Sequence, residues 1–174
     1  MKQLNLILLL ILGIVFGSGV VEAKKYKWAY GGAYEVYTTG QSSNGAQLVK
    51  AWAVAKNADK AIDQAKMDAV SAAFFTGIAY DVEETHGMGV ATLPALVNSQ
   101  QYRDNEQLFM EFFKTGEFLR YVSSVHSSYP TGENNVAVPG GRRVCVSLKI
   151  DYPGLKRWLE VNGIKKSIGD YFKN

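Results

Sequence analysis

Two strict periodicities stand out along the chain, one of period two and one of helical period. Through residues 142–151, apolar side chains alternate without error with more polar ones. The apolar positions are Val144, Val146, Leu148 and Ile150. This alternation predicts a strand with one face in the core. After Asn57, a good N-cap residue, alanines repeat at helical spacing as far as Gly77, which predicts an amphipathic helix.

Less regular patterns predict the other elements. Residues 26–38 are rich in Tyr, Trp and Val and contain Gly31 and Gly32, which favours a strand with a bulge. Residues 46–56 predict a second strand, with small side chains on one face to admit a close helix.

In the second half of the chain, residues 102–115 predict a helix that ends at Gly116. Residues 118–128 predict a strand, and residues 129–141 a turn-rich connection between strands. Asp151 is expected to cap a last helix that stops at Gly163.

The predicted order is therefore β-β-α-α-β-β-α, with residues 78–101 as a long loop between the first two helices. Strands that come in neighbouring pairs favour an antiparallel sheet over a doubly wound parallel one. We expect an α+β fold, in which an antiparallel sheet of about four strands carries helices on one face.

The first 23 residues have the layout of a cleavable signal peptide. Lys2 precedes an apolar run over residues 4–16, a Gly-Ser-Gly break follows, and Val21 and Ala23 supply small side chains at the cleavage positions. The alternative is a membrane anchor, because residues 4–21 are just long enough to span a bilayer. We expect cleavage after Ala23, a single domain over residues 24–174, and membrane contact only if this segment stays attached.

Composition narrows the function classes. The formal net charge of the 174 residues is +3, and Lys and Arg are scattered, which disfavours a nucleic-acid partner. The single cysteine, Cys145, cannot form an internal disulfide and is expected to be an inert buried side chain in a strand.

Two segments, "NADKAIDQAKMDAVSAAFFTGI" and "GRRVCVSLKIDYPGLKRWLEVNGI", resemble small exported domains of bacterial envelopes. That group includes the N-terminal domain of a flagellar-assembly protein and related surface lipoproteins. The chain lacks the signal-region cysteine of the lipoprotein members. The resemblance implies an envelope-associated binding or assembly module without chemistry of its own, and it supplies no catalytic residue.

Residues 78–101 form the longest stretch without a secondary-structure period, and loops of this length are often functional. They contain Glu83, Glu84 and His86, which we predict as binding residues; the alternative for these three is a solvated turn. His86 and His126 lack the spacing of metal ligands, so neither a metal site nor a cofactor is expected. The Gly-x-Ser-x-Gly elbow of serine hydrolases and the phosphate-binding glycine loops are also absent from the sequence.

A second candidate site is the row of aromatic residues at even positions near the mature N-terminus. Its members are Tyr26, Trp28, Tyr30 and Tyr34. On a strand they would share one face and form a platform for a sugar or a partner strand. The alternative is a covered core face or a cross-strand ladder with Trp52.

Two functions follow as hypotheses. The first is a non-catalytic module of the periplasm or cell surface that binds an envelope protein or glycan through its long loop and sheet edge. The second is a small hydrolase of envelope polymers or esters, using Glu83, Glu84 or His86. Convergent acidic and histidine side chains in a pocket would favour the enzyme.

Overall fold

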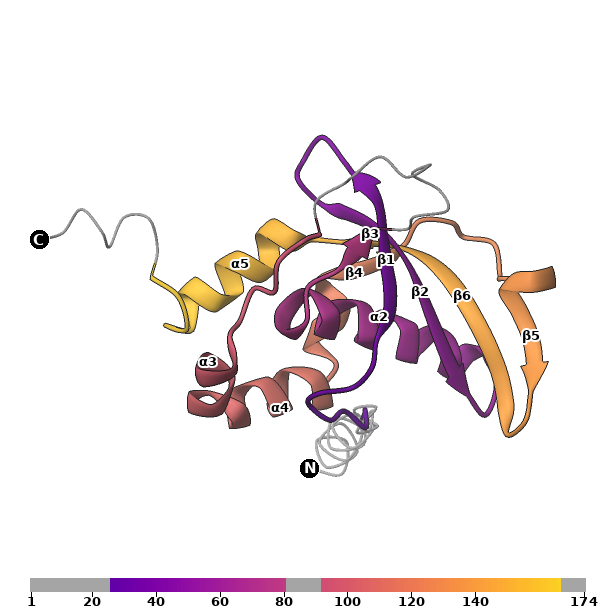
Figure 1. The fold of residues 1–174 in the computed structure, drawn as a ribbon, viewed down its shortest axis with the longest axis horizontal. Coiled ribbons are helices and arrows are strands. Elements are labelled where there is room, and N and C mark those ends of the chain that lie inside the picture. Colours follow the sequence, from indigo (N-terminus) through magenta and orange to yellow (C-terminus); the bar gives the residue numbers. More distant parts are fainter. Residues whose placement is uncertain (1–25, 81–91, 167–174) are drawn as a thin grey trace, which may run out of the picture.

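The computed structural model describes residues 26–80 and 92–166, where helices cover one face of a six-stranded sheet (Figure 1). The strands are β1 (Glu35–Gln41), β2 (Gln47–Ala55), β3 (Ala79–Tyr80), β4 (Val122–Ser124), β5 (Asn135–Val138) and β6 (Gly141–Ile150). The helices are α2 (Ala58–Phe75), α3 (Ser99–Asp104), α4 (Glu106–Lys114) and α5 (Tyr152–Val161), with 3₁₀ turns η1 (Glu117–Arg120) and η2 (Gly132–Asn134). The predicted α+β class is confirmed.

The sheet is larger than predicted and is not purely antiparallel. Its order is β3-β1-β2-β6-β4, and β5 pairs with β6 as well. All pairs are antiparallel except β1 and β3. The parallel pair arises because α2 carries the chain across the sheet from β2, so that β3 returns beside β1 in the same direction. The predicted antiparallel pairing therefore holds for every pair but one, and the prediction of about four strands was too low.

The two long strands at the centre of the sheet match their predictions closely. β2 and β6 pair antiparallel along their whole length, from Gln47 opposite Ile150 to Ala55 opposite Arg142. The four alternating apolar residues predicted for β6 are all buried. On β2, Val49, Ala51 and Ala53 are buried on the same side, as the small-residue face predicted. This side of the sheet is the core.

The ends of α2 are fixed by the residues that the sequence indicated. The side chain of Asn57 accepts a hydrogen bond from the Lys60 backbone N–H at 3.0 Å and caps the first turn. Beyond the other end, Gly77 has a positive φ of 77°, and a Cβ there would lie 2.4 Å from the carbonyl oxygen of Leu93. Only glycine fits this position, because the chain turns sharply against a neighbouring backbone.

The last helix is also as predicted. The Asp151 side chain accepts from the Gly154 backbone N–H at 3.0 Å, which caps α5. Leu155, Trp158 and Leu159 are buried on its inner face, and the ring of Trp158 lies 4.6 Å from that of Phe112 on α4. Through this contact α5 and α4 join the core that α2 forms with the sheet.

Five predicted boundaries were wrong. Residues 26–34 are not a strand, since β1 begins only at Glu35. The predicted helix over residues 102–115 is two helices that meet at Asn105. α3 begins at Ser99, so the long loop is shorter than predicted. The side chains of Asn98 and Gln101 form a capping box at its start, a signal that could have been recognised in the sequence.

The other two errors concern residues 118–141. Gly116 has a positive φ of 82° and directs the chain into η1, so only Val122–Ser124 of the predicted strand is β structure. The predicted turn-rich connection contains β5, which forms a hairpin with β6 across Pro139 and Gly140. A Pro-Gly pair between two valine-containing segments is a turn signal that identifies this hairpin.

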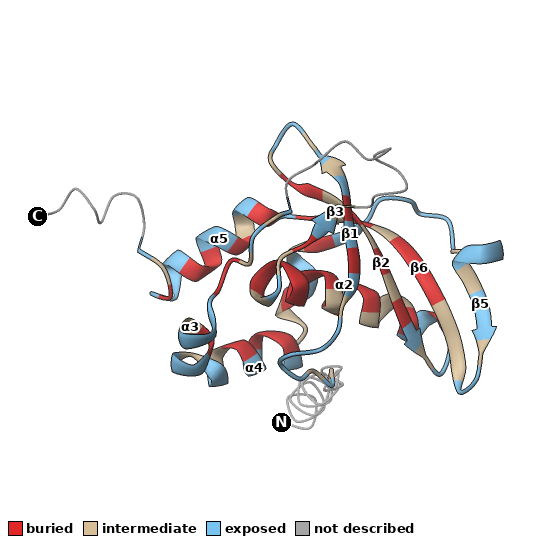
Figure 2. Cartoon of the chain, viewed as in Figure 1, coloured by how far each residue is buried: buried red, intermediate tan, exposed pale blue. Residues whose placement is uncertain are grey.

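α2 packs against β2 and β6 and passes behind the strands in Figure 1, where α3, α4 and α5 lie to one side of them. Buried residues alternate with more exposed ones along β1 and β2 (Figure 2). The other face of the sheet carries no helix in the described part of the chain. Within those same residues, no helix is both long and apolar enough to cross a membrane.

Candidate binding surfaces

The predicted aromatic row lies in an irregular segment outside the sheet, residues 26–34, which turns at Tyr30 and Gly31 and which we call the strap. Its side chains at even positions pack against the helical layer, whereas Lys27 and Ala29 are exposed. The period-two pattern therefore identified correctly which side chains share a face. It did not identify the partner of that face, which is a set of helices rather than a neighbouring strand.

Trp28 is the centre of the strap. Its ring stacks on Phe113 of α4, with centroids 4.4 Å apart and planes inclined by 10°, and also contacts Phe75 of α2 at 5.6 Å. Its indole N–H donates to the Ser71 hydroxyl at 2.8 Å. Trp52, the partner predicted for this row, instead lies on the opposite face of the sheet, under the guanidinium of Arg143.

On either side of Trp28, the rings of Tyr26 and Tyr30 also pack against aromatic residues of the helical layer. Tyr26 meets Phe118 edge to face at 5.0 Å, and Tyr30 stacks on Tyr102 of α3 at 3.8 Å. Tyr30 remains 42% exposed. The rings of the row are partly buried and pack against the core, with Tyr30 as the accessible end, and a binding role for the row stays a prediction.

Polar groups lie beneath the strap on α2. Burial raises the pKa of Asp68 to about 6, although the Gln64 side chain donates a hydrogen bond to its carboxylate at 2.7 Å, which opposes this rise. Burial also raises the pKa of Tyr34, and the Asp68 charge adds to this effect. The Ser71 hydroxyl and the Gly32 backbone lie close enough to the Tyr34 hydroxyl to oppose this rise, although neither meets strict hydrogen-bond geometry.

The second predicted site falls outside the described residues. Glu83, Glu84 and His86 all belong to residues 81–91, so their assignment stays a prediction. The chain on either side is anchored: Ile78 and Leu93 exchange two backbone hydrogen bonds of 2.9 Å. The predicted recognition loop therefore begins and ends at a fixed point beside the edge strand β3.

The helix-free face of the sheet is a surface that sequence reasoning did not assemble. Strand register places Tyr37, Lys50 and Ser147 in one row across β1, β2 and β6. The next row holds Glu35, Trp52 and Cys145, and the one beyond it holds Val54 and Arg143. Alternation within one strand cannot show this shared face, because it depends on the strand order.

An electrostatic cluster marks the middle of this face. The Arg143 guanidinium lies 3.9 Å from the centroid of the Trp52 ring, a cation–π contact. The same group forms an ion pair with Glu35 on β1. Tyr37 is 36% exposed, and Val54 is more exposed still. The face therefore combines accessible apolar side chains with basic ones.

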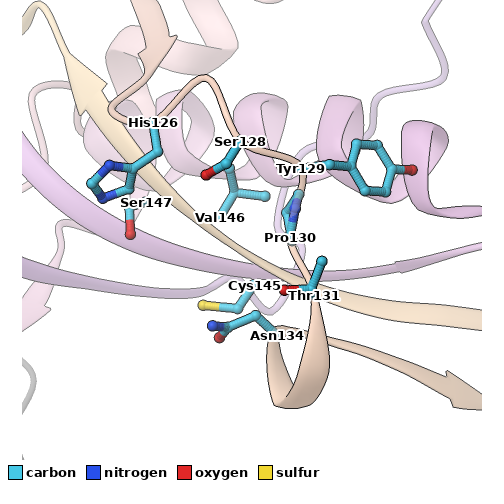
Figure 3. A pocket seen from close by; sticks show the side chains of 9 residues that line it. All are labelled: His126, Ser128, Tyr129, Pro130, Thr131, Asn134, Cys145, Val146 and Ser147. Atoms are coloured by element: carbon cyan, nitrogen blue, oxygen red, sulfur yellow. The ribbon is translucent and has the colours of Figure 1, made fainter.

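A small hollow adjoins this face where the edge of β6 lacks a strand partner (Figure 3). The Val125 N–H still donates to the Ser147 carbonyl at 2.9 Å, but residues 126–134 then leave β6, and pairing resumes at Asn135. The hollow between has a volume of ≈ 190 Å³. Figure 3 shows His126 and Ser147 at one end and Cys145 near Asn134 at the other.

The hollow brings together residue types that serve in nucleophilic catalysis, but not in a working arrangement. Among the described residues, no hydrogen bond links the His126 ring to the hydroxyl, thiol or carboxylate that would orient a catalytic base. Cys145 is only 6% exposed, as predicted for a buried side chain. Within the described ranges no three His, Cys, Asp or Glu side chains are grouped to hold a metal ion.

No family model, curated protein or solved structure matches this chain.

Proposed function

We propose that the protein is a non-catalytic exported module that binds another component of the cell envelope on the helix-free face of its sheet. The observation that supports the proposal most is the character of this face. It is broad and open, and it presents Tyr37, Val54 and the Arg143–Trp52 pair without a covering helix in the described part of the chain. Exposed aromatic and arginine side chains are typical of binding surfaces.

The charges on this face favour an anionic partner. Register places Lys50, Lys149 and Arg143 on the outer side of β2 and β6, and among the described residues of β1, β2 and β6 one acidic residue, Glu35, shares this side. Basic residues around accessible rings suit an acidic envelope glycan, since the rings contact sugar faces while the cations attract carboxylates.

The long loop belongs to the same proposal as an adjoining recognition element. It follows β3, which lies beside β1 at the edge of the sheet.

Export rests on the signal layout of residues 1–23. N-terminal sequencing of protein recovered from outside the cytoplasm should give Lys24 as the first residue; a product that retains residues 4–16 would make this segment an anchor.

The binding proposal is tested by charge reversal on the two faces of the molecule. The Lys50→Glu/Lys149→Glu double variant should weaken binding to a polyuronate, an acidic polysaccharide, by tenfold or more at low salt. The matched control is Lys66→Glu/Lys114→Glu, which makes the same charge change on α2 and α4 of the helical layer. Binding is measured by calorimetry, with neutral dextran as the comparison polymer.

Each outcome has a definite meaning. Loss in the sheet-face variant alone supports the proposed surface. Equal loss in both variants shows attraction to overall charge and contradicts it, and so does binding to dextran as strong as to the polyuronate. Absence of binding by the native protein overturns the choice of an acidic glycan as partner.

A further inference from the structure

A second hollow, separate from the one beside β6, opens where the β1–β2 turn, the end of β3 and the start of α5 meet; we call it the end pocket. Residues 93–94 complete its walls. Its volume is ≈ 340 Å³. Small-molecule sites range over roughly 300–1,000 Å³, so the end pocket has the size for one small molecule or one sugar ring.

The walls of the end pocket are held in place by contacts between distant segments. The Tyr152 hydroxyl donates to the Pro94 carbonyl at 3.0 Å and so joins α5 to one wall. The backbone hydrogen bonds of Leu93 fix the same wall to the chain before β3. At Gly45 a Cβ would lie 3.2 Å from the Cγ of Pro153, so the β1–β2 turn packs closely on α5. The pocket therefore exists before a ligand enters, which lowers the entropic cost of binding.

Two glutamine side chains that line the pocket are weakly bonded within the protein. Gln41 and Gln47 oppose each other in the β1–β2 ladder. Their amides donate to the Gly45 carbonyl at 3.4 and 3.5 Å, which is at the limit of a hydrogen bond. Gln47 is only 4% exposed, and buried amides normally have well-formed partners. Among the described residues, both amides thus keep donors and acceptors for a ligand.

The end pocket carries one positive charge. Lys156 is exposed on α5, with its ammonium 5.0 Å from the centroid of the Tyr152 ring. The described residues that line the pocket include neither aspartate nor glutamate. The N-terminus of α5 adds little, because Asp151 already accepts from the Gly154 N–H and Pro153 has no N–H. The pocket therefore favours a ligand with one negative charge, and it offers no acidic partner to the ammonium of an amino acid.

We propose that the end pocket binds a single sugar acid, a pyranose ring that carries one carboxylate. The carboxylate pairs with the Lys156 ammonium, and the sugar hydroxyls exchange hydrogen bonds with the amides of Gln41 and Gln47. Tyr80, which is partly exposed, and Pro94 supply apolar surface for the C–H groups of the ring. A phosphate fits less well, because the described lining offers neither an arginine nor an uncapped helix N-terminus.

The end pocket is distinct from the helix-free face. Gln47 lies on the same side of β2 as the buried residues Val49 and Ala51, so the pocket is at the end of the covered side of the sheet. The inference therefore stands whether or not the helix-free face binds a glycan.

The experiment is a titration of the isotope-labelled protein with sodium galacturonate, followed by NMR at the side-chain amides of Gln41 and Gln47. These signals should shift saturably, and galactose, which lacks the carboxylate, should shift them far less at equal concentration. Lys156→Met keeps the apolar stem and should weaken galacturonate binding by about tenfold or more, because a hydrogen bond to a charged group is lost. The matched control is Arg157→Met, which removes an exposed charge of α5 that does not line the pocket and should leave binding unchanged.

Two further variants locate the ligand. Gln41 is exposed, so Gln41→Met should fold, and it should weaken galacturonate binding several-fold while the preference over galactose remains. The Lys50→Glu/Lys149→Glu variant of the helix-free face should bind galacturonate as the native protein does. Far-UV circular dichroism checks that each variant is folded.

A loss in Lys156→Met and Gln41→Met, with binding kept in Arg157→Met, supports the end pocket. Three results overturn it: no saturable shift in the native protein, galactose bound as tightly as galacturonate, or equal loss in Lys156→Met and Arg157→Met. Binding that is lost in Lys50→Glu/Lys149→Glu and kept in Lys156→Met would also overturn it, and would support the helix-free face as the site instead.

Discussion

Strand β6 and the strap both direct every second side chain into the same core, yet different forces hold them. β6 has β2 along one edge, and β4 and β5 along parts of the other. The strap has rings of α2, α3 and α4 beneath it and no strand beside it. The backbone hydrogen bonds of β6 fix its position even where a side chain is removed, while the strap depends on each ring contact.

The comparison shows why these two segments differ in their freedom to move. Opening β6 would break ladders on both edges and expose four buried aliphatic side chains, a cost comparable to unfolding the domain. Opening the strap exposes aromatic surface but breaks few backbone bonds. Segments of this second kind can open without global unfolding.

The largest effect is expected in β6. Leu148→Ala should lower the free energy of unfolding by about 2 to 5 kcal/mol, because this side chain is fully buried and its loss leaves a cavity in the core. Chemical denaturation followed by circular dichroism measures the change. A loss under about 1 kcal/mol, the range of surface substitutions, would mean that this face of β6 is not the core.

A smaller effect is expected in the strap. Trp28→Ala should cost about 1 to 3 kcal/mol, less than full burial of a tryptophan predicts, because Trp28 is only partly buried. Trp28→Phe keeps a ring over Phe113 but loses the donor to Ser71, so its cost should be about 0.5 to 1.5 kcal/mol. The same denaturation assay compares the two variants.

The order of these two costs is informative. If Trp28→Ala and Trp28→Phe were equally destabilising, the indole hydrogen bond would hold the strap, and not the stacking. If Trp28→Ala cost as much as Leu148→Ala, the strap would be an integral part of the cooperative core, contrary to the comparison drawn above.

The sequence predicted side-chain faces better than it predicted hydrogen-bond partners. Alternation reports which residues avoid water, and this holds for β6 and the strap alike. Whether an extended segment joins a ladder depends on which edges of the sheet are open, and that is a long-range property. For the same reason α2, capped by Asn57 and ended near Gly77, was predicted correctly, whereas the two-residue strand β3 was missed: helical signals are local and strand pairing is not.

For the candidate surfaces too, local patterns in the sequence were informative and long-range arrangement was not. The aromatic row was found from its spacing, although its role as a cover of the core required the positions of Phe75 and Phe113. The helix-free face could not be assembled, because placing Glu35, Trp52 and Arg143 together requires the order β1-β2-β6. A substitution on that face, Glu35→Gln, is expected to change the free energy of unfolding less than Leu148→Ala or Trp28→Ala.

Glu35→Gln removes the ion pair with Arg143 at a position where both side chains are well exposed to solvent. Exposed ion pairs contribute little, because water and salt screen them and ordering two long side chains costs entropy. We expect a change within about 0.5 kcal/mol at physiological ionic strength, with the Arg143 guanidinium remaining over Trp52. Denaturation at low and high salt measures it, and Glu111→Gln on α4 is the control for loss of an exposed acid. A loss above about 1.5 kcal/mol that persists in high salt would show that the outer face of β6 is as important for folding as its inner face, and the proposed binding surface would then be structural.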